Sequence, residues 1–434
     1  MKRYDSYKDS GVKWLGKIPS HWEVKRLRAA VTERKERFNS SESLMILSLL
    51  KDKGIIPYDE KGEVGNKSKD DHSQYKVARK GDLVINSMNV IIGSLGITPY
   101  DGYISPAYYS FRPNRDINLS YYSYILSLRK VQQSIRCFSK GIMEIRLKIS
   151  AYDFLSMPFP FPNKEEQTAI ANYLDAATSK IYEAIAQQQK MIDLLNERKQ
   201  IIINNAVTKG LDPNVKMKPS GVDWIGDIPE HWNLKRLGYC SWIRARLGWK
   251  GLKANEYVDN GYPFLSAFNI QNNKLVWDNV NFINKQRYDE SPEIKLNVGD
   301  ILLVKDGAGI GKCARVDTMP LGEATANGSI AFITPYDGLF YKYLHYFIIS
   351  PSFKRYTVLL LTGMGVPHFT QGEMKNVLIP IPTIDEQLKI SEFLDDKLGK
   401  IDTVIDSYKR QISLLQERKQ IIINDVVTGN VKVV

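Results

Sequence analysis

Cysteine is scarce in this sequence of 434 residues, and long apolar runs are missing. The three cysteines, Cys137, Cys240 and Cys313, lie far apart and form no CxxC pair. A sparse, odd set of this kind argues against a disulfide framework or a zinc module and fits a reducing cytoplasm. No stretch of 18 apolar residues occurs and the first residues turn polar at once. We therefore expect no membrane helix and no secretory signal.

Catalytic motifs are missing as well. GAGIGK (307–312) has its first glycine one position too close for the phosphate-binding pattern GxxxxGK[ST], and Cys313 stands where that pattern has Ser or Thr. We interpret it as a glycine turn after a strand, with Lys312 as a candidate phosphate contact. The five histidines show no metal-ligand spacing, and no glycine loop for S-adenosylmethionine and no nuclease ExK set is present. We expect no catalytic residue, metal or cofactor in this chain.

Positive charge is in excess, with 60 Lys and Arg against 48 Asp and Glu and a net charge of +12. A polyanion is therefore the first partner to consider. Hydrophobic residues make up 43% and charged residues 25%, which is typical of a folded chain, and the length suffices for two or three domains.

The chain repeats itself with a period above 200 residues. GVKWLGKIPSHWEVKRLR (11–28) returns as GVDWIGDIPEHWNLKRLG (221–238), with eleven of 18 positions identical. LNERKQIIINNAVT (195–208) returns as LQERKQIIINDVVT (415–428), with eleven of 14 identical. We call 11–28 and 221–238 the boxes. His21 and His231 lie inside them beside Trp22 and Trp232, and we interpret the Ile-Pro, Trp and Leu residues of the boxes as anchors of a domain base.

The stretches between these phrases barely resemble each other. We call them the first module, Ala29 to Met157, and the second module, Tyr239 to Leu378. Faint matches remain, such as KGDLVIN (80–86) against VGDILLV (298–304). A duplicated frame around two diverged interiors predicts one scaffold that presents two different readers.

Two long helices are expected after the modules. Asn163 is a candidate N-cap, and Gly210 and Gly429 are candidate helix ends. Within each expected helix, mostly apolar residues recur at spacings of three and four, which predicts a coiled-coil seam. We expect the helices to pair antiparallel; alternatively, each joins a separate bundle or a helix of a partner. The seam positions are Leu174, Thr178, Ile181, Ile185, Gln188, Ile192, Leu195, Lys199 and Ile202, and Leu394, Leu398, Ile401, Ile405, Tyr408, Ile412, Leu415, Lys419 and Ile422.

The modules have an α+β pattern. Gly-Asp turns precede the apolar runs Leu83–Ile85 and Ile301–Val304, and near-alternation over Tyr103–Phe111 also predicts strand. Helices are expected near Leu119–Ser134 and Leu339–Tyr356.

Two basic stretches, one in each module, are the candidate DNA contacts. Residues 129–148 hold six cations against one acid, and residues 241–254 hold four cations, no acid and two tryptophans. Basic side chains with interleaved aromatics suit phosphate contact and groove reading, although a charge run is often only a solvated face. Together with Lys312, the candidates are Arg129, Lys130, Arg136, Lys140, Arg146, Lys148, Arg244, Arg246, Lys250 and Lys253.

The layout resembles the specificity subunit of type I restriction–modification systems. The resemblance rests on GxIPxHWxxKRL before each module, IPIPxxDEQxxIxxFLD after it, and a helix ending in ERKQxIIxxxVT. It covers essentially the whole chain, and it implies two α/β target-recognition domains separated by two long antiparallel coiled-coil helices, with an internal pseudo-twofold duplication. The implied domains are 1–162 and 211–382 for recognition, and 163–210 and 383–434 for the helices.

The resemblance also implies function and partners. Each module reads one half of a bipartite double-stranded DNA site, the helices set the spacer, and the chain itself is not catalytic. Two modification subunits bind S-adenosylmethionine and methylate adenine, and restriction subunits use ATP and Mg. The resemblance assigns no base-reading residue and no target sequence.

Two other functions compete with DNA recognition, an enzyme that acts alone and a protein scaffold. A stand-alone nuclease or methyltransferase needs the catalytic motifs that are missing. A pure protein scaffold explains the helices but leaves two diverged basic modules unexplained.

Overall fold

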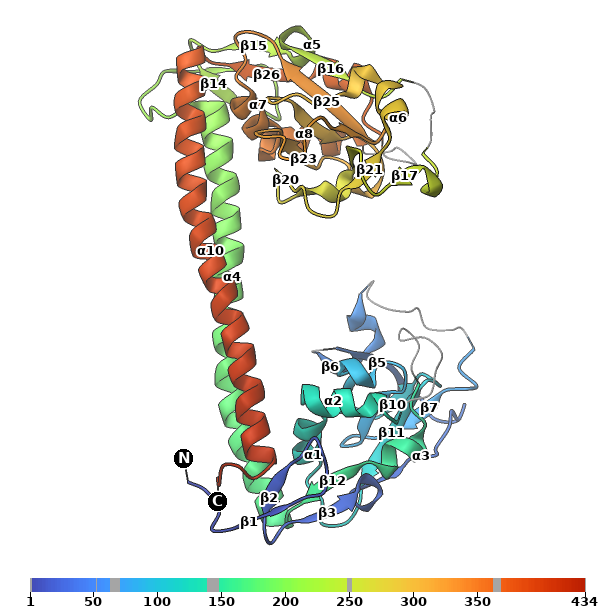
Figure 1. Ribbon diagram of the computed structural model, residues 1–434. Helices are drawn as coiled ribbons and strands as arrows, with labels where there is room; N and C mark the ends of the chain where they lie inside the picture. The colour runs from blue at the N-terminus through green and yellow to red at the C-terminus, as the bar shows by residue number, and fades with distance from the viewer. Residues whose placement is uncertain are drawn as a thin grey trace. The chain divides into compact units, whose positions relative to one another are not determined.

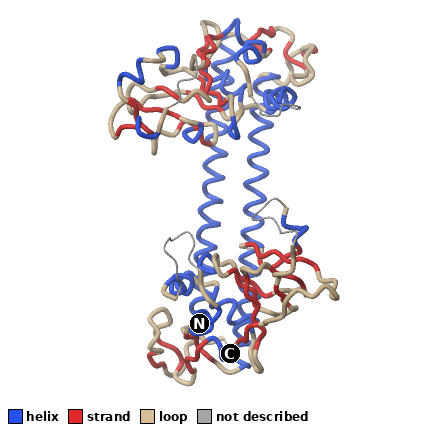
Figure 2. Tube along the Cα trace, turned by 90° about the vertical axis from the view of Figure 1, so that its right-hand side faces the viewer, coloured by secondary structure: helices blue, strands red, loops and turns tan. Residues whose placement is uncertain are grey.

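A computed structural model describes residues 2–51, 53–62, 71–138, 148–247, 252–361 and 368–433. The chain divides into two compact units. Unit 1 is Met1–Gln188 with Lys409–Val434, and unit 2 is Gln189–Tyr408. Each unit holds one box, one module and part of each long helix. In unit 1 the chain ends meet, because Lys2 and Lys432 form an antiparallel bridge (Figures 1 and 2).

The long helices are α4 (Lys164–Lys209) and α10 (Ile384–Val427). They run side by side (Figure 1), and residue numbers rise in one as they fall in the other. Contacts join Tyr182 with Lys419, Gln188 with Gln411, and Lys199 with Asp402. The antiparallel pairing is therefore confirmed. Every predicted seam position is buried or half-buried, so the heptad pattern is confirmed as well.

The helices begin at side-chain caps. The Asn163 carboxamide oxygen accepts a hydrogen bond from the Glu166 N–H at 2.8 Å, which confirms the predicted cap of α4. At α10, the Thr383 hydroxyl accepts from the Glu386 N–H at 3.3 Å, and the Glu386 carboxylate accepts from the Thr383 N–H at 3.2 Å. This reciprocal pair is a capping box.

The helices end at glycines in the left-handed conformation. Gly210 and Gly429 have φ of +77° and +76°, as helix C′ positions favour. A Cβ at Gly429 would lie 2.4 Å from Pro19 of the first box. The glycine therefore also allows the end of α10 to pack against that box.

The first module holds two four-stranded sheets, β4-β11-β8-β9 and β6-β5-β10-β7. β8 confirms the strand predicted at Leu83–Ile85. The elements of the box and module are β1 (Tyr7–Asp9), β2 (Lys17–Pro19), β3 (Glu23–Arg26), β4 (Val31–Glu33), β5 (Met45–Leu50), β6 (Gly54–Pro57), β7 (Lys76–Ala78), β8 (Leu83–Asn86), β9 (Leu95–Ile97), β10 (Gly102–Ile104), β11 (Tyr108–Pro113), α1 (Leu119–Leu126), α2 (Arg129–Arg136), α3 (Ala151–Ser156) and β12 (Pro158–Phe161).

The second module repeats this plan with sheets β16-β25-β22-β23 and β17-β21-β18-β24. β22 confirms the strand predicted at Ile301–Val304. The elements are β13 (Met217–Pro219), β14 (Asp227–Pro229), β15 (Asn233–Arg236), α5 (Leu237–Cys240), β16 (Ser241–Arg244), β17 (Tyr257–Val258), β18 (Tyr262–Leu265), β19 (Ile270–Gln271), β20 (Lys274–Leu275), β21 (Asn281–Ile283), α6 (Lys285–Asp289), β22 (Ile301–Val304), β23 (Cys313–Arg315), β24 (Thr325–Ala326), β25 (Ile330–Pro335), α7 (Tyr341–Ile348), α8 (Pro351–Leu361), α9 (Gln371–Asn376) and β26 (Leu378–Ile381).

Strand pairing makes the modules equivalent despite their divergence. β8 and β22, the strands with the faint sequence match, each lie beside the longest strand of their sheet, β11 or β25. One parallel pair occurs in each second sheet, β5 with β10 and β18 with β24. The two second sheets differ at both edges, because β7 extends the first beside β10, whereas β17 extends the second at the opposite edge, beside β21.

Three predicted elements are each divided in two. The helix expected near Leu119–Ser134 is α1 and α2, because Leu128 between them is extended, with ψ of 130°. The helix expected near Leu339–Tyr356 is α7 and α8, because Pro351 lacks an N–H and opens a new helix. Tyr103–Phe111 holds the end of β10, a turn, and the start of β11.

Candidate nucleic-acid interface

The first box is bound to α4 through one carboxylate. Glu166, in the first turn of α4, lies 3.0 Å from His21 Nε2 and accepts a hydrogen bond from Trp22 Nε1 at 3.2 Å. Trp22 is fully buried. Trp22 thus anchors the base of the module, as interpreted from the sequence, and His21 contacts the same carboxylate.

The second box repeats this joint. Glu386 of α10 lies 2.9 Å from His231 Nε2 and accepts from Trp232 Nε1 at 3.3 Å. Burial acts to raise the pKa of Glu386, but the hydrogen bonds from His231 and Trp232 hold it below its ordinary value. Two diverged modules therefore rest on the same joint.

The glutamine that follows each of these glutamates binds the module. Gln167 accepts from the Asn118 N–H at 2.9 Å, just before α1. Gln387 accepts from the Phe340 N–H at 2.8 Å, just before α7. In EEQ (165–167) and DEQ (385–387), the glutamate thus binds the box and the glutamine after it binds the module.

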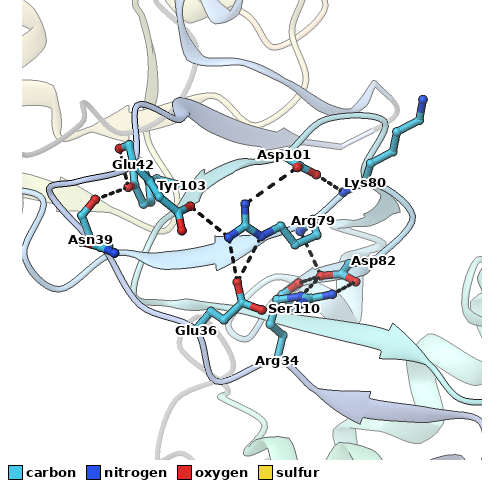
Figure 3. Close-up of polar contacts among 10 residues, drawn as sticks. All are labelled: Arg34, Glu36, Asn39, Glu42, Arg79, Lys80, Asp82, Asp101, Tyr103 and Ser110. Atoms are coloured by element: carbon cyan, nitrogen blue, oxygen red, sulfur yellow. Dashed lines mark hydrogen bonds and ion pairs between the residues drawn. The ribbon is translucent and has the colours of Figure 1, made fainter.

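We call β4-β11-β8-β9 and β16-β25-β22-β23 the main sheets of the two modules. A buried ion pair stabilises the main sheet of the first module (Figure 3). Arg34, just after β4, donates to Asp82 from Nε at 2.5 Å and from Nη2 at 3.0 Å. The Ser110 hydroxyl donates to the same carboxylate at 2.7 Å, and so does the Arg79 N–H at 3.0 Å. Asp82 thereby joins an edge strand to the Gly-Asp turn before β8.

The second module has the same pair. Arg244 Nη2 donates to Asp300 at 2.7 Å, and Thr334 bonds to both residues. The Arg244 and Asp300 side chains are 4% and 0% exposed. This burial argues against the predicted DNA contact by Arg244, because a guanidinium committed to a buried carboxylate cannot face a phosphate. The stretch 241–254 contains no acid, but the partner of Arg244 is Asp300, which lies 56 residues away in sequence.

The other predicted cations occupy varied positions. Arg129 and Arg136 are exposed on α2, and Lys148, Lys253 and Lys312 are exposed on loops. These five remain predicted DNA contacts.

Two further candidates are half-buried. Lys130 lies 5.8 Å from the centre of the Trp14 ring, and burial lowers its pKa. Arg246 is half-buried beside Arg287, and burial lowers its pKa as well. Both also remain predictions. Lys140, Arg146 and Lys250 lie outside the described residues.

One cationic cluster was missed by the sequence reasoning. Lys76 of β7 donates to the Tyr108 carbonyl at 2.6 Å and lies 4.2 Å from the centre of the Tyr109 ring. Burial lowers the pKa of Lys76; the negative charge of Glu33 opposes this shift, and the positive charges of Arg37 and Lys148 add to it. Strand pairing assembles these cations from separate stretches, and only Lys148 lay in a basic run.

Two further findings concern the described residues alone. None of their helices has the length and apolar content to cross a bilayer. No group of three or more of their His, Cys, Asp and Glu side chains has the arrangement of a metal site.

Residues 19–192 and 229–412 match the Type I restriction modification DNA specificity domain. The chain belongs to this family. Each match spans about half of one box, all of one module and the first part of the following helix. The domain therefore occurs twice, and the resemblance inferred from the sequence is confirmed.

Individual relatives cover most of the chain. It is 27% identical to the type I restriction enzyme MjaVIII specificity subunit of Methanocaldococcus jannaschii, over 74% of this chain and 72% of the relative. It is 23% identical to a provisionally named MjaX specificity subunit of the same organism, over 96% of both chains. A solved chain from a study of type I R-M complex assembly has the same fold, with a TM-score of 0.69 and 16% identity over 95% of this chain and 99% of that one.

Proposed function

We propose that this chain is the DNA sequence-specificity subunit of a type I restriction–modification complex. Each module reads one half of a bipartite site in double-stranded DNA. The observation that carries the proposal is the pairing of retained joints with diverged modules, in a family defined by DNA specificity. The same box-to-helix contact positions both modules in the same way, and modules of different sequence read different DNA sequences.

The paired helices fix the spacer between the half-sites. A helix pair with a buried seam is stiff, whereas a flexible linker would allow many spacings. The helices also dock two modification subunits, which methylate adenine, and restriction subunits join the complex. S-adenosylmethionine, ATP and Mg belong to those partners, and this chain acts in the cytoplasm without a cofactor or a catalytic residue of its own.

An exchange of the first module tests the proposal. Residues 29–157 are replaced by the corresponding module of a relative, with both boxes and both helices kept. The full chain is expressed with its modification subunits, and methylated adenines are mapped in the genome. One half of the recognition site is expected to change, while the other half and the gap stay the same.

A change in both halves, or in the gap, would contradict modular reading. The scaffold alternative predicts that the assembled complex shows no salt-sensitive, sequence-selective DNA binding. The enzyme alternative predicts that the purified chain alone methylates or cleaves DNA.

A further inference from the structure

Each module carries a nine-residue segment that begins at the last residue of a central strand and ends just before the next strand. Residues 86–94 connect β8 to β9, and residues 304–312 connect β22 to β23. We call them the first and second strand-end loops. Each closes with the same backbone hydrogen bond, from Asn86 N–H to Ser94 C=O at 3.0 Å and from Val304 N–H to Lys312 C=O at 2.8 Å.

Further backbone hydrogen bonds hold the two loops in the same place. The Ser87 N–H donates to the Ala107 C=O at 3.2 Å, and the Lys305 N–H donates to the Ser329 C=O at 2.8 Å. Gly93 and Gly311 take the same left-handed φ, +87° and +85°. The two loops therefore share a backbone frame.

Their side chains have little in common. NSMNVIIGS and VKDGAGIGK agree only in the Ile-Gly pair near the end. A shared frame with different side chains is what two readers of different sequences require, since the frame fixes the approach and the side chains set the chemistry.

The first strand-end loop exposes groups suited to base edges. Met88 and Ile92 are 41% and 49% exposed. Asn89 is exposed too, and its carboxamide makes no hydrogen bond with another described residue. These three residues line a hollow of about 350 Å³, together with Lys51 and Tyr108. Lys148 lies beside this loop, because the N–H of its neighbour Ile149 donates to the Ser87 C=O at 3.1 Å.

The second strand-end loop offers different chemistry. The Lys312 ammonium is exposed in this loop, next to Gly311. A Cβ at Gly309 would lie 3.5 Å from Ala267, whose neighbour Phe268 is 86% exposed. The second loop thus presents a cation and lies near an exposed aromatic residue, whereas the first presents an amide and two apolar side chains.

We propose that the two strand-end loops read base identity, one in each half-site, and that Asn89 is a specificity-determining residue of the first. An asparagine amide pairs with adenine N6 and N7 in the major groove, and aliphatic side chains contact the thymine methyl. The exposed Lys148 lies beside the first loop and holds a phosphate. This inference rests on the proposed function, because it needs DNA as the partner.

An exchange of loop residues tests this proposal. Residues 87–93 (SMNVIIG) are replaced by KDGAGIG, the seven residues at 305–311, in the full chain with its modification subunits. Methylome mapping is expected to show a changed first half-site, an unchanged second half-site and an unchanged gap. Retention of both half-sites at wild-type methylation levels would overturn the inference.

A point variant covers the case in which the exchanged loop fails to fold. Asn89→Ala is expected to reduce discrimination at one adenine position about 10- to 100-fold, with the slope of affinity against salt unchanged. Asn214→Ala, an exposed asparagine in the turn between α4 and β13, is the matched control and is expected to leave specificity as it was. Unaltered discrimination in Asn89→Ala would overturn the role of this residue.

The wild-type complex separates the two levels of the argument. If it methylates no bipartite site, the proposed function fails. If it does so, and the loop exchange and Asn89→Ala both leave the site intact, only the present inference fails.

Discussion

In both units a tyrosine of the module bonds to an aspartate of the long helix, but two cations join that aspartate in the second module and none does in the described part of the first. In unit 1 the Tyr124 hydroxyl donates to Asp175 of α4 at 2.6 Å. In unit 2 the equivalent Tyr346 donates to Asp395 of α10, and Arg315 and Lys342 join at 3.0 and 2.9 Å. The shared Tyr-Asp contact belongs to the duplicated frame, and the two added cations belong to the diverged module.

The buried ion pairs also combine a contact that both modules share with surroundings that differ. Arg34 with Asp82 and Arg244 with Asp300 occupy equivalent places in the two main sheets. The third partner differs, Ser110 in one and Thr334 in the other. Divergence has thus changed what surrounds the pair and left the pair itself. A module can vary its readers because its internal fastening and its joint to the helix stay constant.

The largest expected effect is on the free energy of unfolding, and it differs between the two buried ion pairs. Arg244→Met leaves Asp300 charged and fully buried, so we expect a loss of about 3–5 kcal/mol in the free energy of unfolding. Arg34→Met is expected to cost less, about 1–3 kcal/mol, because the Arg34 side chain is 16% exposed against 4% for Arg244. Urea denaturation gives the losses, and hydrogen exchange in β4 and β16 assigns each to its module.

The double variant Arg244→Met with Asp300→Asn is the control, since it removes the stranded charge and should recover part of the loss. It also decides the role of Arg244. If the folded double variant has lost discrimination at one base, Arg244 reads DNA after all; if specificity is intact, its role is structural. Equal losses in the two single variants would remove the difference between the modules.

Sequence patterns predicted the frame well because its signals are local. Helix periodicity, the Asn163 cap and the two terminal glycines act within a few residues, and the structure has them where they were predicted. The strands at β8 and β22 were found for the same reason. The breaks between α1 and α2 and between α7 and α8 were missed, because the apolar pattern continues across both.

The candidate site was less predictable because distant residues build it. A basic run does not reveal that Arg244 is neutralised by an aspartate elsewhere, or that Lys76 lies near Lys148. The strand-end loop at 86–94 has no charge at all, so a search for cations passes over it. Its topological equivalence to 304–312 becomes visible only through the hydrogen bonds of the two sheets.

A second, smaller effect concerns the contacts to the long helices. Asp395→Asn weakens three charged or polar contacts and is expected to cost about 1–3 kcal/mol, whereas Asp175→Asn weakens the bond from Tyr124 and is expected to cost about 0.5–1.5 kcal/mol. Thermal unfolding at constant salt compares the two variants. Similar losses would mean that Arg315 and Lys342 add nothing to the second contact.

The pH dependence of Asp395→Asn follows from the direction of its pKa. Burial acts to raise the pKa of Asp395, but hydrogen bonds from Tyr346, Lys342 and Arg315 hold it below its ordinary value. A lowered folded-state pKa gives stability that is complete above the unfolded value of about 3.9 and is lost as pH falls through the folded value. The difference between wild type and Asp395→Asn should therefore be constant above about pH 5 and shrink below about pH 4. A difference that grows on acidification would contradict this assignment.

The smallest expected effect separates phosphate contacts from base contacts within the first module. Lys148 is exposed, and its charge acts on the half-buried Lys76. If it contacts a phosphate, Lys148→Ala removes one counterion-releasing contact, so the slope of log affinity against log salt should fall by about one for every DNA sequence alike. Lys17→Ala, an exposed lysine on β2 of the box, should leave the slope unchanged. Fluorescence anisotropy of the assembled complex on cognate and scrambled duplexes measures both. Because Asn89→Ala is expected to change discrimination and not the slope, the two variants should have opposite signatures; a Lys148→Ala complex that loses specificity at a constant slope would make Lys148 a base reader instead.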